Sequence, residues 1–261
     1  MSPTTSFRAG SLARPWPDDE PYDDIPRGTL KSGKEAEIFL VERRFERSGS
    51  RLLAHKRYRI RYPGKDELRA EGFSNSTSFR RHAMYRDGWF VGSRDRRALS
   101  AGNRSSYGQQ LAATLWPIQE WTTLRRAWEA GASVPFPVEQ TDDGLLMEFI
   151  GDETQAAPKL VQGKLAADEL ADAWEQLLAN VRTLTAAGLV HADLSAYNLL
   201  WWQGRLVVID LPQAVEFTTN ADAFELLHRD LVNVAEWFRR RGVAIDVEAV
   251  YGELVSVAWL G

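Results

Sequence analysis

The sequence predicts an α+β fold in two lobes, because strand-like segments dominate its first part and helical patterns its second. Two strand-like segments within residues 29–60, separated by a Ser-Gly-Ser turn at 48–50, indicate a small sheet. A short apolar strand at 144–150 ends at a glycine, and apolar residues then recur at helical spacing. We therefore expect a cleft between the lobes near residues 147–151.

Changes in composition predict how the chain is divided. Residues 1–27 are rich in Pro, Ser, Asp and Arg, and we expect a mobile tail there. We expect an N-lobe at 28–150 and a C-lobe at 151–261. Within the N-lobe, residues 61–110 are rich in arginine and poor in apolar periodicity, which predicts a long insertion.

The remaining elements follow from apolar spacing and stop signals. One helix is expected from residue 111 or 117 to residue 130, where Gly131 ends it. The C-lobe is expected to hold a helix over the apolar stripe at 170–184, a β-hairpin within 189–209, and helices at about 221–241 and 247–260.

Overall composition excludes several classes of function. The 261 residues carry a net charge of −4 and contain no cysteine. The molecule as a whole is therefore not a basic nucleic-acid binder, and disulfides, thiolate metal sites and a cysteine nucleophile are excluded. No apolar run approaches the ~18 residues of a membrane span, and the N-terminus lacks the apolar core of a secretory signal. We expect a cytoplasmic protein with no membrane partner.

One segment, HADLSAYNLLWWQGRLVVID at residues 191–210, combines three oxygen-bearing side chains. Asp210 ends an apolar strand, Asn198 lies before the predicted hairpin, and Asp193 precedes Asn198 by five residues. Carboxylate and amide oxygens are hard ligands that suit Mg²⁺, and a second carboxylate can accept a proton from an attacking hydroxyl. Taken singly, each would be an ordinary turn residue. An aspartate after four apolar strand residues, however, calls for a functional reason.

The same segment resembles the catalytic loop of protein-kinase-like enzymes, and its full pattern resembles the RIO family of atypical serine/threonine kinases. That family's motif reads close to HADLSxYN…IDxxQxVE. The resemblance covers roughly residues 28–240, and the matching segments are 191–198 and 209–216, SGKEAEIF at 32–39, MEFIG at 147–151 and APKL at 157–160. It implies a two-lobed protein-kinase-like fold with a reduced C-lobe, and ATP-dependent phosphoryl transfer with Mg²⁺.

The resemblance also assigns roles in the catalytic segment. Asp193 would be the catalytic acid/base, Asn198 and Asp210 would hold the metal, and His191 would support the loop. In the RIO family the residue matching Asp210 is also implicated as a phospho-acceptor, which implies an ATPase-like cycle.

Four more residues would bind the phosphates of ATP. Lys56 matches the family's strand lysine, and Glu120 matches its acidic partner on the helix after the insertion. Ser32 and Lys34 lie in the loop that would cover the phosphates. Outside this pattern, Lys56 would be a solvated strand lysine and Glu120 an exposed helix charge.

The adenine side of the site is expected at the predicted hinge. Met147 would lie behind the adenine pocket, and Glu148 and Ile150 would offer backbone groups to the base. The sequence also departs from ordinary protein kinases, since His-Ala-Asp replaces His-Arg-Asp and no Ala-Pro-Glu element follows Asp210. These departures put a conventional peptide substrate in doubt.

Two alternatives remain open at this point. One is a small-molecule phosphotransferase of the aminoglycoside or choline kinase type, which shares the H-x-D-x-x-x-x-N…D core. The other is a nucleotide-gated binding scaffold with vestigial turnover. A further partner is an RNA or ribosomal contact through the Arg-rich segment 79–107, because arginine clusters bind phosphates and the interleaved aromatic residues could stack on bases.

Overall fold

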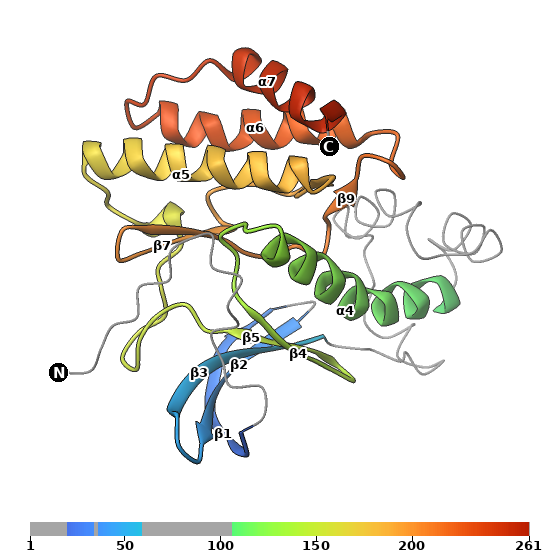
Figure 1. The fold of residues 1–261 in the computed structure, drawn as a ribbon, viewed down its shortest axis with the longest axis vertical. Coiled ribbons are helices and arrows are strands. Elements are labelled where there is room, and N and C mark those ends of the chain that lie inside the picture. The colour runs from blue at the N-terminus through green and yellow to red at the C-terminus, as the bar shows by residue number, and fades with distance from the viewer. Residues whose placement is uncertain (1–19, 34–35, 59–105, 261) are drawn as a thin grey trace, which may run out of the picture.

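A five-stranded antiparallel sheet forms the N-terminal part of the computed structural model, which describes residues 20–33, 36–58 and 106–260 (Figure 1). The strand order is β1-β2-β3-β5-β4. The bounds are Tyr22–Ser32 for β1, Ala36–Phe45 for β2, Gly49–Tyr58 for β3, Pro137–Thr141 for β4 and Gly144–Glu148 for β5. The predicted sheet at 29–60 is thus present, and the predicted strand at 144–150 is its fourth member in space.

The first strand corrects the predicted extent of the tail. β1 begins at Tyr22, so residues 22–27 belong to the sheet, while residues 1–19 lie outside the described part. β1 is an edge strand whose side chains are almost all exposed, so its sequence carries no apolar alternation. Its pairing with β2 is irregular near Pro26, which cannot donate to the ladder.

Close contact between β3 and β5 depends on Gly144. Lys56 pairs with Leu145 in the register, and Ala54 pairs with Met147. A Cβ atom added at Gly144 would lie 1.8 Å from the Lys56 carbonyl oxygen. The absence of a side chain at Gly144 therefore allows β5 to approach β3 closely at Lys56.

Helix α4, Ser106–Glu129, lies between the sheet and the helical part of the molecule (Figure 1). It begins earlier than predicted, so residues 106–110 are not part of an irregular insertion, and residues 61–105 lie outside the described part. Pro117 favoured a helix start at that position, yet it lies inside the helix. Leu124 and Ala127 of α4 join Leu145 of β5 in the core.

The C-terminal part is a layer of three helices above small strands (Figure 1). Trp174 and Phe238 meet edge to face, with ring centroids 5.3 Å apart, and fix α5 against α6. No helix in the described ranges is long and apolar enough to cross a membrane. The bounds are Leu160–Gln162 for the 3-10 turn η2, Ala167–Ala186 for α5, Leu189–Val190 for β6, Leu199–Trp202 for β7, Arg205–Val208 for β8, Val215–Glu216 for β9, Ala223–Arg239 for α6 and Val247–Leu260 for α7.

The hairpin β7–β8 confirms the turn expected within residues 189–209. Gln203 and Gly204 both have positive φ, 51° and 76°, as a two-residue hairpin turn requires. Leu189 and Val190 instead form β6, which pairs with β9. The loop from β6 to β7 and the loop from β8 to β9 therefore both run between the same two strand pairs, and they carry the residues of the candidate site.

Candidate active site

The loop between β6 and β7 is fixed by His191. The buried imidazole accepts a hydrogen bond at Nδ1 from the Asp193 backbone N–H, 3.3 Å away. Its Nε2 therefore carries the proton and donates to the Ile209 carbonyl oxygen at 3.1 Å. His191 thus ties the loop that holds Asp193 to the strand end that precedes Asp210.

Asn198 lies against Asp193. Its side-chain nitrogen donates to the Asp193 carbonyl oxygen at 2.8 Å and to the Asp193 carboxylate at 3.1 Å. With the nitrogen engaged in this way, the amide oxygen Oδ1 is left to accept another ligand. The Ile209 N–H donates to the Asn198 carbonyl oxygen at 3.0 Å, so Asn198 also adjoins the strand that leads to Asp210.

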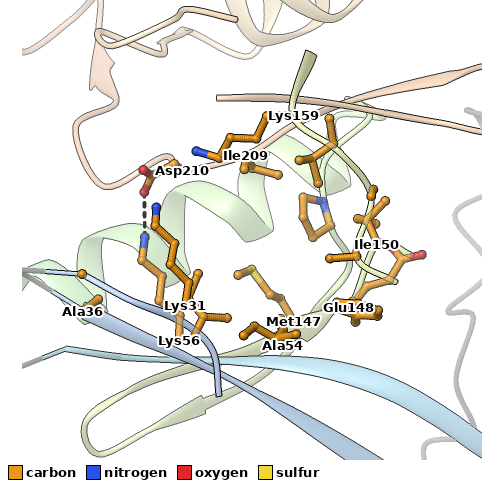
Figure 2. A pocket seen from close by; sticks show the side chains of 18 of the residues that line it. Lys31, Ala36, Ala54, Lys56, Met147, Glu148, Ile150, Lys159, Ile209 and Asp210 are labelled. Carbon is orange, nitrogen blue, oxygen red and sulfur yellow. Dashed lines mark hydrogen bonds and ion pairs between the residues drawn. The ribbon is translucent and has the colours of Figure 1, made fainter. Parts of the chain in front are cut away.

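A lysine bridges two carboxylates across the cleft. Lys56 Nζ lies 2.6 Å from Glu120 Oε1 and 2.7 Å from Asp210 Oδ1, and Figure 2 shows the pair with Asp210. Lys56 and Glu120 are buried, whereas the Asp210 side chain is 46% exposed because it faces the open cleft. The Tyr58 hydroxyl donates to the other oxygen of Glu120. Residues from β3, α4 and the end of β8 thus meet at one point.

Electrostatics keep Lys56 and Asp210 charged. Burial alone would lower the pKa of Lys56, but the negative charges of Asp210 and Glu120 outweigh it and raise that pKa well above its usual value. The Lys56 charge is the main cause that lowers the pKa of Asp210 to about 2. Asp210 is therefore ionised at neutral pH and ready to bind a cation.

Two residues of the site have unusual backbone conformations. Ala192 has φ of 63° and Asp210 has φ of 67°, both in the left-handed region. A non-glycine residue in this region is uncommon and is held there only where the surrounding structure demands it. Both residues lie in the loops that carry the candidate site. Backbone strain of this kind often occurs at functional sites.

A cavity of about 780 Å³ adjoins this charged group (Figure 2). Its volume falls within the range of small-molecule sites. Lys56 and Asp210 lie on one side of it, and an apolar portion extends toward the segment that joins the two lobes. That apolar portion is lined by Ala36, Ala54, Met147, Ile150, Leu200 and Ile209.

The segment after β5 leaves one backbone donor available. The Glu148 N–H donates to the Phe136 carbonyl oxygen at 2.8 Å, and the Ile150 carbonyl oxygen accepts from Ala157 N–H at 2.9 Å. No hydrogen bond from the Ile150 N–H is found within the described residues. Burial raises the pKa of the Glu148 carboxyl, which accepts from the Phe136 N–H at 3.1 Å.

Of the two residues predicted for the phosphate-covering loop, only Ser32 lies within the described residues. Ser32 ends β1, and its hydroxyl donates to the Glu37 carboxylate at 3.1 Å. Its neighbours Lys31 and Gly33 line the cavity instead. Lys34 lies outside the described residues.

Three residues near the site were not predicted from the sequence. Lys31 and Lys159 both line the cavity. Lys159 falls within the APKL segment at 157–160, but that segment was given no role in the site, and Lys31 lies outside the quoted motifs. Asp230 is buried in α6 beneath the β6–β7 loop, and the preceding Arg229 donates to the Ala192 carbonyl oxygen at 2.5 Å. Burial is the main cause that raises the pKa of Asp230 to about 6, although the neighbouring His191 and Arg229 oppose it.

Comparison with solved structures defines the class of fold. The Rio2 kinase from Chaetomium thermophilum matches with a TM-score of 0.56 at 20% identity, over 89% of this chain and 63% of that one. The Rio2 kinase-ADP/Mg2+-phosphoaspartate complex from the same organism matches with a TM-score of 0.54 at 19% identity, over 87% and 61%. The chain therefore has the expected two-lobed, protein-kinase-like fold.

Sequence comparison then defines the family. The family model described as the RIO domain matches residues 74–250. The RIO-type serine/threonine-protein kinase Rio1 of Haloferax volcanii is 35% identical over 226 residues, which cover 86% of this chain and 67% of that protein. The serine/threonine-protein kinase RIO3 of Homo sapiens is 40% identical over 130 residues, 49% of this chain and 25% of that protein. This chain belongs to the RIO family.

Proposed function

We propose that the chain catalyses ATP-dependent phosphoryl transfer with Mg²⁺, as a RIO-type serine/threonine protein kinase or ATPase. The observation that carries the proposal is the meeting of Lys56 with Glu120 and Asp210 at one side of a nucleotide-sized cavity. Membership of the RIO family supports the same activity. The chain spans two thirds of the archaeal relative and a quarter of the animal one, so activity and substrate are proposed here for the chain itself.

In this proposal Asn198 and Asp210 hold Mg²⁺. The donor set fits the ion, because the carboxylate is ionised and the hydrogen bonds of the Asn198 nitrogen leave its amide oxygen as the ligand atom. Among the described residues no cluster of three His, Asp or Glu side chains is placed to hold a metal. Magnesium sites of nucleotide enzymes take few protein ligands and complete their shell with phosphate and water. When bound, Mg²⁺ would neutralise charge that develops on the phosphates.

Asp193 acts in the proposal as the catalytic acid/base. Its side chain is exposed and its carboxylate accepts a hydrogen bond from Asn198, so a hydroxyl or water can reach it. It would orient the attacking oxygen and accept its proton.

A further proposal makes Asp210 itself a phospho-acceptor. The Rio2 kinase-ADP/Mg2+-phosphoaspartate complex from Chaetomium thermophilum, which this chain resembles in fold, supports the idea.

Lys56 and Glu120 position the phosphates in this scheme. Glu120 orients the ammonium group by a 2.6 Å ion pair, so the lysine can exchange Asp210 for a phosphate oxygen without losing its other partner. Ser32, at the end of β1, and Lys34 are proposed to cover the phosphates. Residues 28–150 would then act as the N-lobe and residues 151–261 as the C-lobe.

Adenine would occupy the apolar part of the cavity. Met147 lines that part, and the free Ile150 N–H would donate to the base. Glu148 would contribute its carbonyl oxygen, since its N–H is already bonded to Phe136. The proposed RNA or ribosomal contact through residues 79–107 concerns a segment that lies almost wholly outside the described residues.

The test uses ATP labelled at the γ-phosphate, with purified protein and Mg²⁺. Free phosphate and label on protein are measured together for the wild type, Asp193→Asn and Asp210→Ala. We expect both variants to lose at least about a hundredfold in turnover, since they remove a proton acceptor and a metal ligand. Asp168→Asn, an exposed change at the start of α5, serves as the matched control and should retain the wild-type rate.

The outcomes separate the proposed activities. Release of free phosphate identifies an ATPase, and transfer of label to a protein identifies a kinase. ATP binding without turnover in the wild type would favour the scaffold alternative. Absence of ATP binding would overturn the proposal.

A further inference from the structure

Two lysines that the proposed mechanism does not use face the phosphate side of the cavity. Lys31 comes from β1 of the N-lobe, and Lys159 comes from the segment before η2 in the C-lobe. Both line the cavity. Figure 2 shows their amino groups, with that of Lys56, on the side of the cavity where Asp210 lies. The two additional cations therefore approach one region from opposite lobes.

These two charges have little compensation within the described part of the chain. No ion pair joins Lys31 or Lys159 to a described carboxylate, whereas Lys56 lies within 2.7 Å of two. Burial lowers the pKa of Lys159, and the positive charge of Lys31 lowers it further, while Asp210 acts in the opposite direction. The two lysines therefore repel each other across the cleft, and an anion placed between them would relieve that repulsion.

The backbone holds Lys159 at this place. Its segment pairs with Leu200 of β7, and its carbonyl oxygen accepts from the Gln162 and Gly163 N–H groups at 2.8 and 3.2 Å. The Lys159 side chain is only partly exposed, and its amino group extends past Ile209 toward Asp210 (Figure 2). The apolar stem of Lys159 thus lies along the cavity wall, while its charged end reaches the side where Asp210 lies.

We propose that Lys31 and Lys159 bind the polyphosphate chain of the nucleotide from its two sides and set the preference of the site for the number of phosphates. The inference rests on the proposed function, because it assumes that an adenine nucleotide occupies the cavity. Each lysine donates charge-assisted hydrogen bonds to phosphate oxygens, so their combined contribution grows with the charge of the ligand. A triphosphate that engages both residues also links β1 to the C-lobe and favours the closed cleft.

The experiment measures equilibrium binding of ATP, ADP, AMP and adenosine by calorimetry, with and without Mg²⁺. The variants are Lys31→Met, Lys159→Met and the double substitution. Methionine retains most of the apolar stem and removes the charge. Lys164→Met is the matched control, because Lys164 is exposed and is not among the residues that line the cavity.

We expect each single substitution to weaken ATP binding by about tenfold, with a smaller loss for ADP and none for adenosine. The double variant should then bind ATP little better than ADP. The difference between wild type and variants should shrink in high salt, because phosphate–lysine attraction is screened. Retained adenosine binding shows that the variants still form the cavity.

Three results would overturn the inference. Variants that keep the wild-type order of affinities would show that the lysines do not contact phosphate. Variants that lose adenosine as strongly as ATP would show that the lysines shape the cavity instead. A wild type that binds none of the four ligands would refute the proposed function as well as the inference. Failure of the inference alone is therefore distinguishable, because the wild type would still bind ATP.

Discussion

Lys56 has two carboxylate partners that differ in their surroundings. The Glu120 side chain is 4% exposed, whereas the Asp210 side chain opens to the cleft. The Glu120 pair is therefore a permanent buried contact, and the Asp210 pair can be exchanged for another ligand. A buried ion pair adds little net stability, but removal of one partner leaves a buried charge that is costly.

This difference predicts a double-mutant result. Lys56→Met should lower the free energy of unfolding by about 3 kcal/mol, because the Glu120 carboxylate stays buried with Tyr58 as its remaining partner. Lys56→Met combined with Glu120→Gln should recover a large part of that loss. Urea unfolding of the two single variants and the double variant gives the coupling. Additive losses would contradict the inferred dependence of Glu120 on Lys56.

Asp230 is expected to make stability depend on pH. The pKa of the Asp230 carboxyl is about 6 in the folded chain, whereas its ordinary value, taken here for the unfolded chain, is 3.8. The folded state therefore binds the proton more tightly than the unfolded state does. The resulting stability is fully present below about pH 4 and is lost as pH rises through about 6. The shift of roughly two pH units corresponds to about 3 kcal/mol.

Asp230→Asn removes this ionisable group and should flatten the dependence of unfolding free energy on pH between about 4 and 6. Chemical unfolding at several pH values in that window measures the slope for both proteins. Asp168→Asn should keep the wild-type slope. Equal slopes for wild type and Asp230→Asn would mean that Asp230 is ionised throughout.

At the scale of elements, long amphipathic helices were the easiest to predict. The stripe at 170–184 falls inside α5, and the helix expected at about 221–241 contains α6, because both bury one continuous apolar face. β1 could not be recognised, since it is held by its backbone ladder and exposes its side chains. The start of α4 was missed because the proline inside that helix resembles a start signal.

The close pairing of β3 and β5 predicts that a single methyl group added at Gly144 strongly lowers the stability of the chain. Gly144→Ala should destabilise the chain by about 3 kcal/mol or more, because its Cβ would overlap the Lys56 carbonyl oxygen and force the strands apart. Gly252→Ala, in the open on helix α7, should instead stabilise by up to about 1 kcal/mol. Thermal unfolding of both variants checks the contrast. A neutral Gly144→Ala would show that β5 shifts freely.

At the scale of the whole molecule, the sequence predicted the family, the fold and where the cleft would lie. Asp193, Asn198 and Asp210 all belong to the segment 191–210, so their proximity could be expected from one stretch of chain. The pairing of Lys56 with Glu120 was implied only by resemblance, and the contact of Lys56 with Asp210 was not predicted, since three separate elements supply these contacts. Asp230 and Lys31 needed the structure, because they lie outside the quoted motifs. Lys159 lies within the APKL motif, but its position beside the cavity also needed the structure.

The 154 positions that separate Lys56 from Asp210 also bear on how the protein is made. A ribosome releases the sheet and α4 well before it has synthesised the strand that ends in Asp210. Lys56 and Glu120 can pair early, but the cleft gains its second carboxylate only after the segment that carries Asp210 has emerged. Contacts of such long range form slowly. Nucleotide capture by a nascent chain would therefore have to wait until synthesis has passed Asp210, long after the sheet and α4 have been made.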